Sequence, residues 1–501
     1  MVHLKRLRRP LPWRRFLGLA WPMALAGMVQ PLTQLMDAAL LGHLQSADYL
    51  AAVAIGGPLL TFMLWIFSFL RMGSCAEIGK QKGSLSPAKI LAVFRRYQLI
   101  ALTLSAVSVT LAALLAPTLT SLMSLSSTVG SLAQEYVFVR LVAAPATLLS
   151  YVLLGTLIGL QQTRKTLWLA LVVNIANLLL DLLFILVLDM ASLGAAIASV
   201  CAEYAGLVVG AWFLHRAYTE LYPVNKLAQG KINRREGSQE FRYIQALLPS
   251  ISYFRGALAS ASFQGFKQSS SYSLNIDLFI RTFFMLLMIN TLIGFSGQLS
   301  VQALAAMGLV LQLSYFLACG VDGFANACET LCAESVGTKN TFALIRRVET
   351  WIVSGFVAGG LLALVLTGAL LAAAPVWISL LSSQADTRQE LTLIFHWFAW
   401  FPILSLPAFI LDGAYIGLGY TRWMRLVAIN TYLLVLLPLG MFAVYVLNSS
   451  LALMIVFLFY TAVRSLAMYW PILKDNRLER YCIRLNQSSP KDASGLAQTT
   501  R

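Results

Sequence analysis

A ten-residue segment occurs twice in this chain. GTLIGLQQTR at residues 155–164 returns as GAYIGLGYTR at residues 413–422, with six of the ten positions identical and an offset of 258 in a chain of 501 residues. A second set of matches has an offset of 254: Leu-Ala-Ala at 50–52 and 304–306, and Gly83 and Gly337. The chain therefore has two related halves, and internal repeats of this kind in a membrane protein are typical of transporters.

The composition predicts an all-α polytopic membrane protein. Apolar residues make up 58% of the chain, charged residues 12%, and the mean hydropathy is +0.74. Soluble domains carry roughly 25% charged residues, and about 20 apolar residues cross a bilayer. Twelve stretches qualify as transmembrane helices: 17–41, 49–72, 97–116, 138–160, 166–188, 192–214, 276–296, 303–325, 350–374, 393–417, 424–446 and 451–473.

The basic residues predict the orientation in the membrane. They lie before the first stretch, in every second loop and in the tail, whereas the alternate loops contain only Arg388. Because cytoplasmic loops carry the excess of Lys and Arg, we expect both termini in the cytoplasm of a bacterial cell, with the protein in the inner (plasma) membrane. This pattern accounts for the net charge of +16 without a nucleic-acid partner.

Six stretches precede a polar, basic connection and six follow it. Because six spans return the chain to the same side, the halves are expected to be parallel repeats, forming two pseudo-symmetric six-helix lobes. Residues 241–254 of the connection are either an interfacial helix or a plain linker. The predicted division is a basic N-terminus 1–16, an N-lobe 17–214, the connection 215–275, a C-lobe 276–473 and a tail 474–501.

Asp37 is the first ionisable residue within a predicted span. A charged side chain in hydrocarbon is costly unless it faces a cavity or a partner, so each such residue is a functional candidate. Asp37 lies about one turn from Thr33 and near Gln34, which makes a polar patch. The alternative is an aspartate at the outer end of its helix, because Gly42 follows closely.

The fifth span carries a sharper cluster. Asn177 and Asp181 are four residues apart and Asn174 precedes Asn177 by three, so we expect one polar helix face. A carboxylate flanked by amide oxygens in a low dielectric can hold an exchangeable proton or coordinate a hard cation such as Na⁺. The alternative is a hydrogen-bonded ladder that only packs helices.

The second half carries different charges. Asp322 and Glu329 are seven residues apart and share a helix face, and Asp412 stands where the first copy of the repeat has Leu154. Asp322 and Asp412 are secondary candidates, whereas Glu329 is expected to be structural.

Two further pairs are expected in or near the spans. Asp277 and Arg281 are expected to pair with each other at the cytoplasmic surface. Arg140 and Glu203 are expected to serve as gate or packing partners.

In their order along the chain, several segments resemble the multidrug and toxic compound extrusion (MATE) transporters, most closely their DinF branch. The resemblance covers nearly all of residues 17–475. It rests on Pro31–Gly83 with GHL at 42–44 and FLRMG at 69–73, Ala144-Pro145 with the 155–164 segment, the Asn177/Asp181 helix, GAAIAS at 194–199 with AEY at 202–204, DLFIRT at 277–282 and GVDGFA at 320–325.

The resemblance implies twelve helices in two lobes that form a V, and drug efflux driven by entry of H⁺ or Na⁺. It also implies a cation site in the first lobe. In this sequence the site residues are Asp37, Asn177, Asp181 and Ser199, with possible Na⁺ binding at Asp37 and Asp181, and the helix-1 bend falls at Pro22. Related members can carry a tyrosine where this chain has Thr33.

The sequence thus predicts a cation-coupled antiporter for small organic cations and amphipathic drugs or toxins, acting as a monomer without a cofactor. A flippase for lipid-linked saccharides is the alternative with a similar architecture. It would favour a cationic cleft, whereas intramembrane acidic residues here outnumber Arg71, Arg140 and Arg281. An enzyme is not expected, because the chain has four histidines and neither HExxH nor GxSxG.

Overall fold

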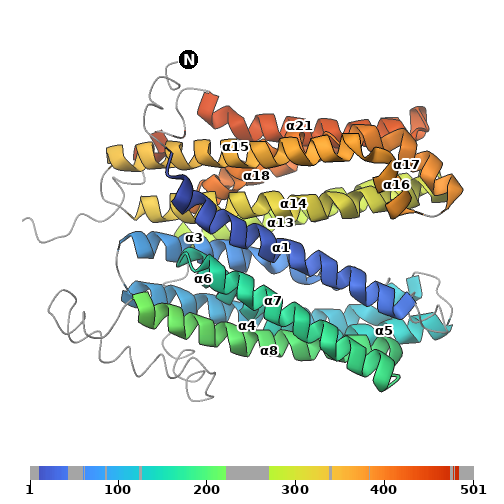
Figure 1. The fold of residues 1–501 in the computed structure, drawn as a ribbon, viewed down its shortest axis with the longest axis horizontal. Coiled ribbons are helices and arrows are strands. Elements are labelled where there is room, and N and C mark those ends of the chain that lie inside the picture. The colour runs from blue at the N-terminus through green and yellow to red at the C-terminus, as the bar shows by residue number, and fades with distance from the viewer. Residues whose placement is uncertain are drawn as a thin grey trace, which may run out of the picture.

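A computed structural model gives the architecture. It describes residues 11–42, 53, 60, 63–84, 87–122, 127–221, 270–337, 341–382, 384–473, 478 and 480–483. These residues form a bundle of long helices, most of them running close to the long axis of the molecule (Figure 1). Among them there is no β-strand.

The helices fall into two groups by chain order, which we call the N lobe and the C lobe. The N lobe consists of α1 (Trp13–Gly42), η2 (Ile66–Ser68), α3 (Phe69–Gly83), α4 (Pro87–Leu122), α5 (Ser127–Leu141), α6 (Ala144–Gly159), α7 (Thr163–Asp181), η3 (Leu182–Val187) and α8 (Ala191–Leu221). The C lobe consists of α13 (Ser270–Leu299), α14 (Val301–Val336), α15 (Thr341–Ala372), α16 (Ala374–Leu381), α17 (Ala385–Phe398), α18 (Phe401–Leu418), α19 (Thr421–Thr431), η5 (Tyr432–Leu436), α20 (Leu437–Met441), η6 (Phe442–Val446) and α21 (Ser450–Leu473).

The helices account for the predicted spans. Within the described ranges, nine helices are long and apolar enough to cross a membrane, and the pair α5–α6, bent by 48°, makes a tenth. α1 also covers the first predicted span, 17–41, whereas most of the second, 49–72, lies outside the described residues. α8 continues to Leu221 and α13 begins at Ser270, so both helices extend into the predicted 215–275 connection, and the proposed helix at 241–254 lies outside the described residues.

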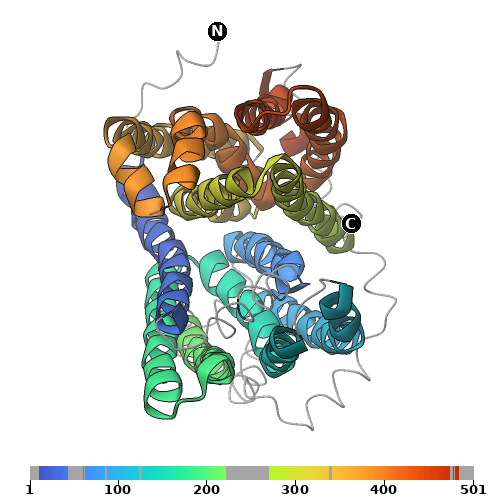
Figure 2. The same cartoon turned by 90° about the vertical axis from the view of Figure 1, so that its right-hand side faces the viewer.

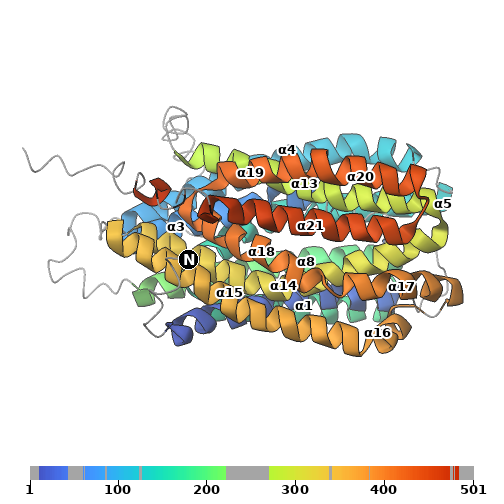
Figure 3. The ribbon, with the colours of Figure 1, turned by 90° about the horizontal axis from the view of Figure 1, so that it is seen from above.

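Seen along its long axis, the bundle separates into the two lobes, with α1 along one side of both (Figure 2). α1 packs against α14 of the C lobe and against α7 of the N lobe. Seen from above, α14, α15 and α21 extend along most of the molecule (Figure 3). We call the end of the bundle where α1 begins and where α3 and α14 terminate the basic end.

The repeat extends to the breaks in the helices. α5 gives way to α6, which begins one residue before Pro145, and α17 gives way to α18, which begins one residue before Pro402. Each proline stands in the first turn of the new helix, where its missing N–H costs nothing. The repeated segments end their helices with matching backbone reversals, at Gln161 (φ 62°) and Gly419 (φ 79°).

The shared glycines of the repeat permit close helix packing. A Cβ atom at Gly155 would lie 2.3 Å from the carbonyl oxygen of Arg71, and one at Gly413 would lie 2.0 Å from that of Ala325. Arg71 and Ala325 are themselves 254 residues apart. The two copies therefore bring α6 onto α3 in one lobe and α18 onto α14 in the other by the same contact.

α3 and α14 occupy equivalent places in the two lobes and meet each other at the lobe interface. A Cβ atom at Gly337 would lie 2.6 Å from Cα of Gly83, so the matched glycines touch at the basic end. One turn deeper, a Cβ atom at Gly79 would lie 2.7 Å from Cβ of Ala333, again an equivalent pair at the offset of 254. The pseudo-symmetry axis therefore passes between these two helices.

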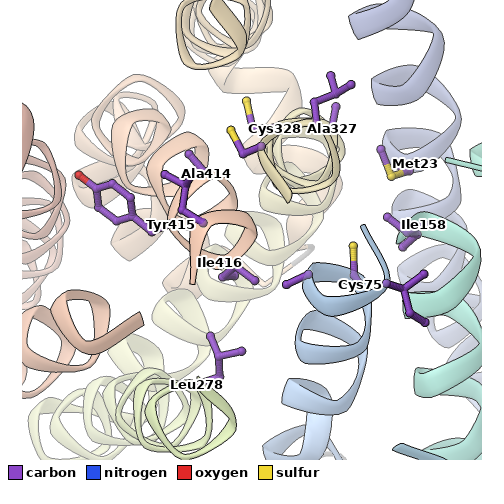
Figure 4. Close-up of a cluster of buried hydrophobic side chains, with 14 of the residues drawn as sticks. Met23, Cys75, Ile158, Leu278, Ala327, Cys328, Ala414, Tyr415 and Ile416 are labelled. Atoms are coloured by element: carbon purple, nitrogen blue, oxygen red, sulfur yellow. The ribbon is translucent and has the colours of Figure 1, made fainter. Parts of the chain in front are cut away.

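A single apolar cluster crosses the interface. Cys75 of α3 lies between Ile158 of α6 and Met23 of α1 on one side and the C-lobe helices on the other, where Cys328 and Tyr415 belong to the same cluster (Figure 4). A second cluster fills the C lobe alone, around Phe395, Phe398 and Phe457, away from the interface. In this conformation the lobes are in close contact near the basic end.

Candidate functional site

Asp181 and Asn177 form a buried polar pair in the N lobe. Asp181 is the last residue of α7 and is 0% exposed. Nδ2 of Asn177 donates a hydrogen bond to Oδ2 of Asp181 at 2.8 Å. The predicted shared face is therefore confirmed. The π-helical segment η3 begins at the next residue, and π-turns in α-helices are frequent at functional sites.

The remaining predicted members of this site lie around the pair. Asn174 is half-buried and donates from Nδ2 to the carbonyl oxygen of Ala170 at 2.7 Å, so its amide group also bonds to its own helix. Ser199 is half-buried on α8, which packs against both α7 and η3.

Asp37, Thr33 and Gln34 lie within α1, but their side chains are outside the described part of the structure. α1 packs along α7 and also contacts η3. It continues as a single helix through Pro22 and Pro31.

Asp412 is held by two arginines inside the C lobe. Its Oδ2 accepts hydrogen bonds from Arg281 of α13 and, at 2.6 Å, from Nη2 of Arg464 of α21. Asp412, Arg281 and Arg464 are 4%, 7% and 9% exposed. Arg464 was not predicted as a site residue, although a lone arginine within the apolar stretch 451–473 is a signal of a buried charge.

The predicted pairing of Asp277 with Arg281 is wrong. Asp277 lies instead against α19, with Nη1 of Arg425 at 2.6 Å and the hydroxyl of Thr421 donating at 2.9 Å. An ion pair between residues four apart on one helix adds only a few tenths of a kcal/mol to stability. Burying an aspartate without a cation beside it costs far more stability than that. Arg281 therefore turns to Asp412.

A polar bridge crosses from the N lobe to the C lobe in the middle of the interface. Nη1 of Arg71 in α3 donates to Oδ1 of Asn326 in α14 at 2.9 Å. Nδ2 of Asn326 in turn donates to Oδ2 of Asp322 at 3.1 Å. Asp322 is thus connected to the N lobe through an amide side chain that the sequence analysis did not select.

Arg140 and Glu203 are confirmed as partners within the N lobe. Nη1 of Arg140 lies 2.9 Å from Oε1 of Glu203, and the hydroxyl of Thr147 donates to the other carboxylate oxygen. This contact joins α5, α6 and α8 on the N-lobe side.

Polar side chains also connect the lobes at the basic end. Arg15 pairs with Glu334, and Nε2 of Gln161 donates to the same carboxylate at 2.9 Å. Within the N lobe at the same end, Nζ of Lys82 donates to the carbonyl oxygen of Leu160 at 3.1 Å. Burial lowers the pKa of Lys82 to about 8, although the nearby carboxylate of Glu334 acts in the opposite direction.

Known proteins match both the sequence and the fold. The MatE family profile matches residues 22–183 and 278–442. DNA damage-inducible protein F of Escherichia coli (strain K12) is 28% identical over 408 residues, which cover 81% of each chain. Protein DETOXIFICATION 43 of Arabidopsis thaliana is 39% identical over 72 residues, which are 14% of each chain.

Solved structures share the fold at low sequence identity. A MOP superfamily transporter from Pyrococcus furiosus has a TM-score of 0.77 at 16% identity, with 94% of this chain and 97% of that chain covered. An outward-facing multidrug resistance MATE family transporter has a TM-score of 0.76 at 18% identity, with 95% and 98% covered. These matches confirm the predicted architecture of twelve transmembrane helices in two six-helix lobes.

The family profile covers most of both lobes, in the order that the repeat requires. The sequence resemblance to the MATE transporters and to their DinF branch is thereby confirmed, and enzymatic activity is not a property of this family. The chain belongs to the MATE family of multidrug efflux transporters.

Proposed function

We propose that this protein exports amphipathic, often cationic organic compounds in exchange for H⁺ or Na⁺ by alternating access. The observation that carries the proposal is the buried Asn177–Asp181 pair beside η3, in contact with α1. A carboxylate in this environment is costly when ionised and unpaired, so its protonation or its binding of a cation changes the energy of the conformation around it.

In the proposed cycle, Asp37 and Asp181 take up the cation from outside, with Asn177 and Ser199 supplying further oxygens. Occupancy removes the negative charge that would otherwise be buried, and α1 rearranges against α7. Exchange requires the cation and the drug to favour different conformations, because a ligand shifts an equilibrium only by its differential affinity.

The proposed location is the bacterial inner (plasma) membrane, with both termini and the basic end in the cytoplasm. This orientation follows from the alternation of basic loops. The Arg15–Glu334 contact then lies at the cytoplasmic side of the lobe interface.

The flippase alternative requires a cationic cleft for pyrophosphate. Four arginines within the lobes lie against acceptors: Arg71 against the amide of Asn326, Arg140 against Glu203, and Arg281 and Arg464 against Asp412. Three of these four charges are paired with carboxylates of the protein, which favours the drug antiporter.

The test is transport by reconstituted protein. The Asp181→Asn and Asp37→Asn variants are expected to lose cation-driven efflux of a fluorescent organic cation while remaining folded. Glu135→Gln is the matched control, since it neutralises an exposed carboxylate elsewhere in the N lobe. Imposing a proton gradient or a Na⁺ gradient separately identifies the coupling ion. Wild-type efflux by both aspartate variants would refute the site.

A further inference from the structure

Glu329 is a buried carboxyl group in the seam between α3 and α14. It is 1% exposed, and its Oε1 has no hydrogen-bond partner within the described part of the chain. The thiol of Cys75 in α3 lies 3.8 Å from the hydroxyl oxygen of Thr330, the next residue of α14. Cys75 and Glu329 are equivalent positions of the repeat, 254 residues apart. The carboxyl group therefore lies at the pseudo-symmetry axis, and only the C lobe supplies one.

Among the described residues, no hydrogen bond from a cation reaches Oε1 of Glu329. The charged and titratable groups that act on Glu329 are Arg71 and Cys75 of α3, Arg281 of α13 and Asp322 of its own helix. Arg71 donates to Asn326, and Arg281 is already paired with Asp412. On α18, Gly417 packs against the backbone carbonyl group of Glu329. On α15, Gly355 and the carbonyl oxygen of Trp351 contact Cys328 in the adjoining turn. None of these groups carries a charge.

The seam closes Glu329 off from the basic end. Glu329 lies eight residues before Gly337, about 12 Å along the helix. Over that distance Gly79 contacts Ala333 and Gly83 contacts Gly337. These contacts can admit water only if α3 and α14 move apart. The ionisation of Glu329 is thus linked to the separation of the lobes, because hydration favours the charged form.

We propose that Glu329 is a proton-binding site at the lobe interface, protonated while α3 and α14 are in contact and deprotonated when they separate at the basic end. The proton passes from the carboxyl oxygen to water entering the opened seam, and the carboxylate left behind is hydrated. This inference rests on the proposed alternating access. It adds a proton-binding group outside the Asp37–Asp181 site, on the opposite lobe.

The test measures lobe separation against pH without substrate or ion gradient. Spin labels are attached at Ser84→Cys and Phe342→Cys, two exposed positions on opposite lobes. The exposed Cys201 and the half-buried Cys319 are replaced by alanine, and the buried cysteines, Cys75 among them, are kept. Electron spin resonance then gives the fraction with separated labels in full-length protein in nanodiscs. Linkage to one proton predicts a rise in the open-to-closed ratio of up to tenfold per pH unit.

The matched variants identify the group. Glu329→Gln is expected to remain closed with a strongly reduced pH dependence, Glu329→Asp to keep a pH dependence, and Glu135→Gln, a change at an exposed carboxylate of the N lobe, to behave as wild type. The measurement is repeated in the Asp181→Asn background, where the response should persist. Loss of the response in Asp181→Asn alone would overturn the Glu329 proposal and leave the proposed function standing.

A second measurement covers the case in which Glu329→Gln does not fold. Infrared spectra of the otherwise unmodified protein should contain the carbonyl band of a protonated, weakly hydrogen-bonded acid, lost as pH rises, and Glu329→Asp should shift that band. A wild-type protein without such a band, or Glu329→Gln with the wild-type pH response, would refute the proposal.

Discussion

The Arg281–Asp412–Arg464 cluster permits a sharp test of the energetics of the C lobe. One carboxylate oxygen accepts from both guanidinium groups, and all three side chains are at most 9% exposed. Asp412→Asn keeps the shape but removes the negative charge, which leaves two buried cations facing a neutral amide. Removing one partner of a buried ion pair costs about 3–5 kcal/mol, and two stranded cations place this variant at the upper end.

The assay is thermal unfolding in detergent. For a unit of the size of one lobe, each kcal/mol lowers the melting temperature by about 2–4 °C, so the expected decrease is roughly 10–20 °C. Asp189→Asn is the matched control. Asp189 is exposed and has a φ of 54°, a conformation that asparagine tolerates well, so its change should stay within about 0.5 kcal/mol.

A rescue experiment separates charge from shape. Replacing Arg281, Asp412 and Arg464 together by methionine or leucine should recover most of the stability, because a well-packed apolar substitute for a buried ion cluster is often neutral or stabilising. If Asp412→Asn melted within 2 °C of the wild type, the assignment of this cluster as the electrostatic centre of the C lobe would be refuted.

Gly413→Ala and Gly155→Ala should each lower the free energy of unfolding by at least about 1–3 kcal/mol, because the added Cβ would lie 2.0 Å and 2.3 Å from backbone oxygens. Gly294→Ala, which has nothing within 4 Å, should be neutral or stabilising. Equal melting temperatures of all three variants would contradict this prediction. The lowered pKa of Lys82 means that the cost of its buried charge is present below pH 8 and disappears as pH rises towards 10.5. The gain in melting temperature between pH 7 and 10 should therefore be smaller in Lys82→Met than in wild type, and an unchanged gain would count against the buried charge.

The membrane-spanning helices were predictable from the sequence, because the length and hydropathy of an apolar stretch determine whether it can cross a membrane. The bend before Pro145 and its equivalent before Pro402 were not predicted, since each lies within or beside an unbroken apolar stretch. Pro145 and Pro402 were the available signals of a new helix, because proline is favoured in the first turn of a helix.

Local and long-range contacts differed in how well they could be predicted. The Asn177–Asp181 bond follows from spacing on one helix, so the sequence alone was sufficient. The partners of Asp412 come from α13 and α21, and no local rule brings them together. Arg281 was assigned to its neighbour Asp277 for the same reason, since the sequence does not record which helix lies across the gap.

The repeat gives the interface its shape, and the differences between the copies give it its charge. If α3 and α14 had kept the same side chains, their meeting at the axis would bring like charges together. Instead Lys80 of α3 is matched by Glu334 of α14. The contact of Arg15 with Glu334, and of Arg71 with Asn326, then favours closure at the basic end. A transporter must also open this seam, and opposite charges alone would only hold it shut. An uncommitted buried carboxyl group at the axis, such as Glu329, supplies the opposing effect, because its ionisation favours the open, hydrated interface.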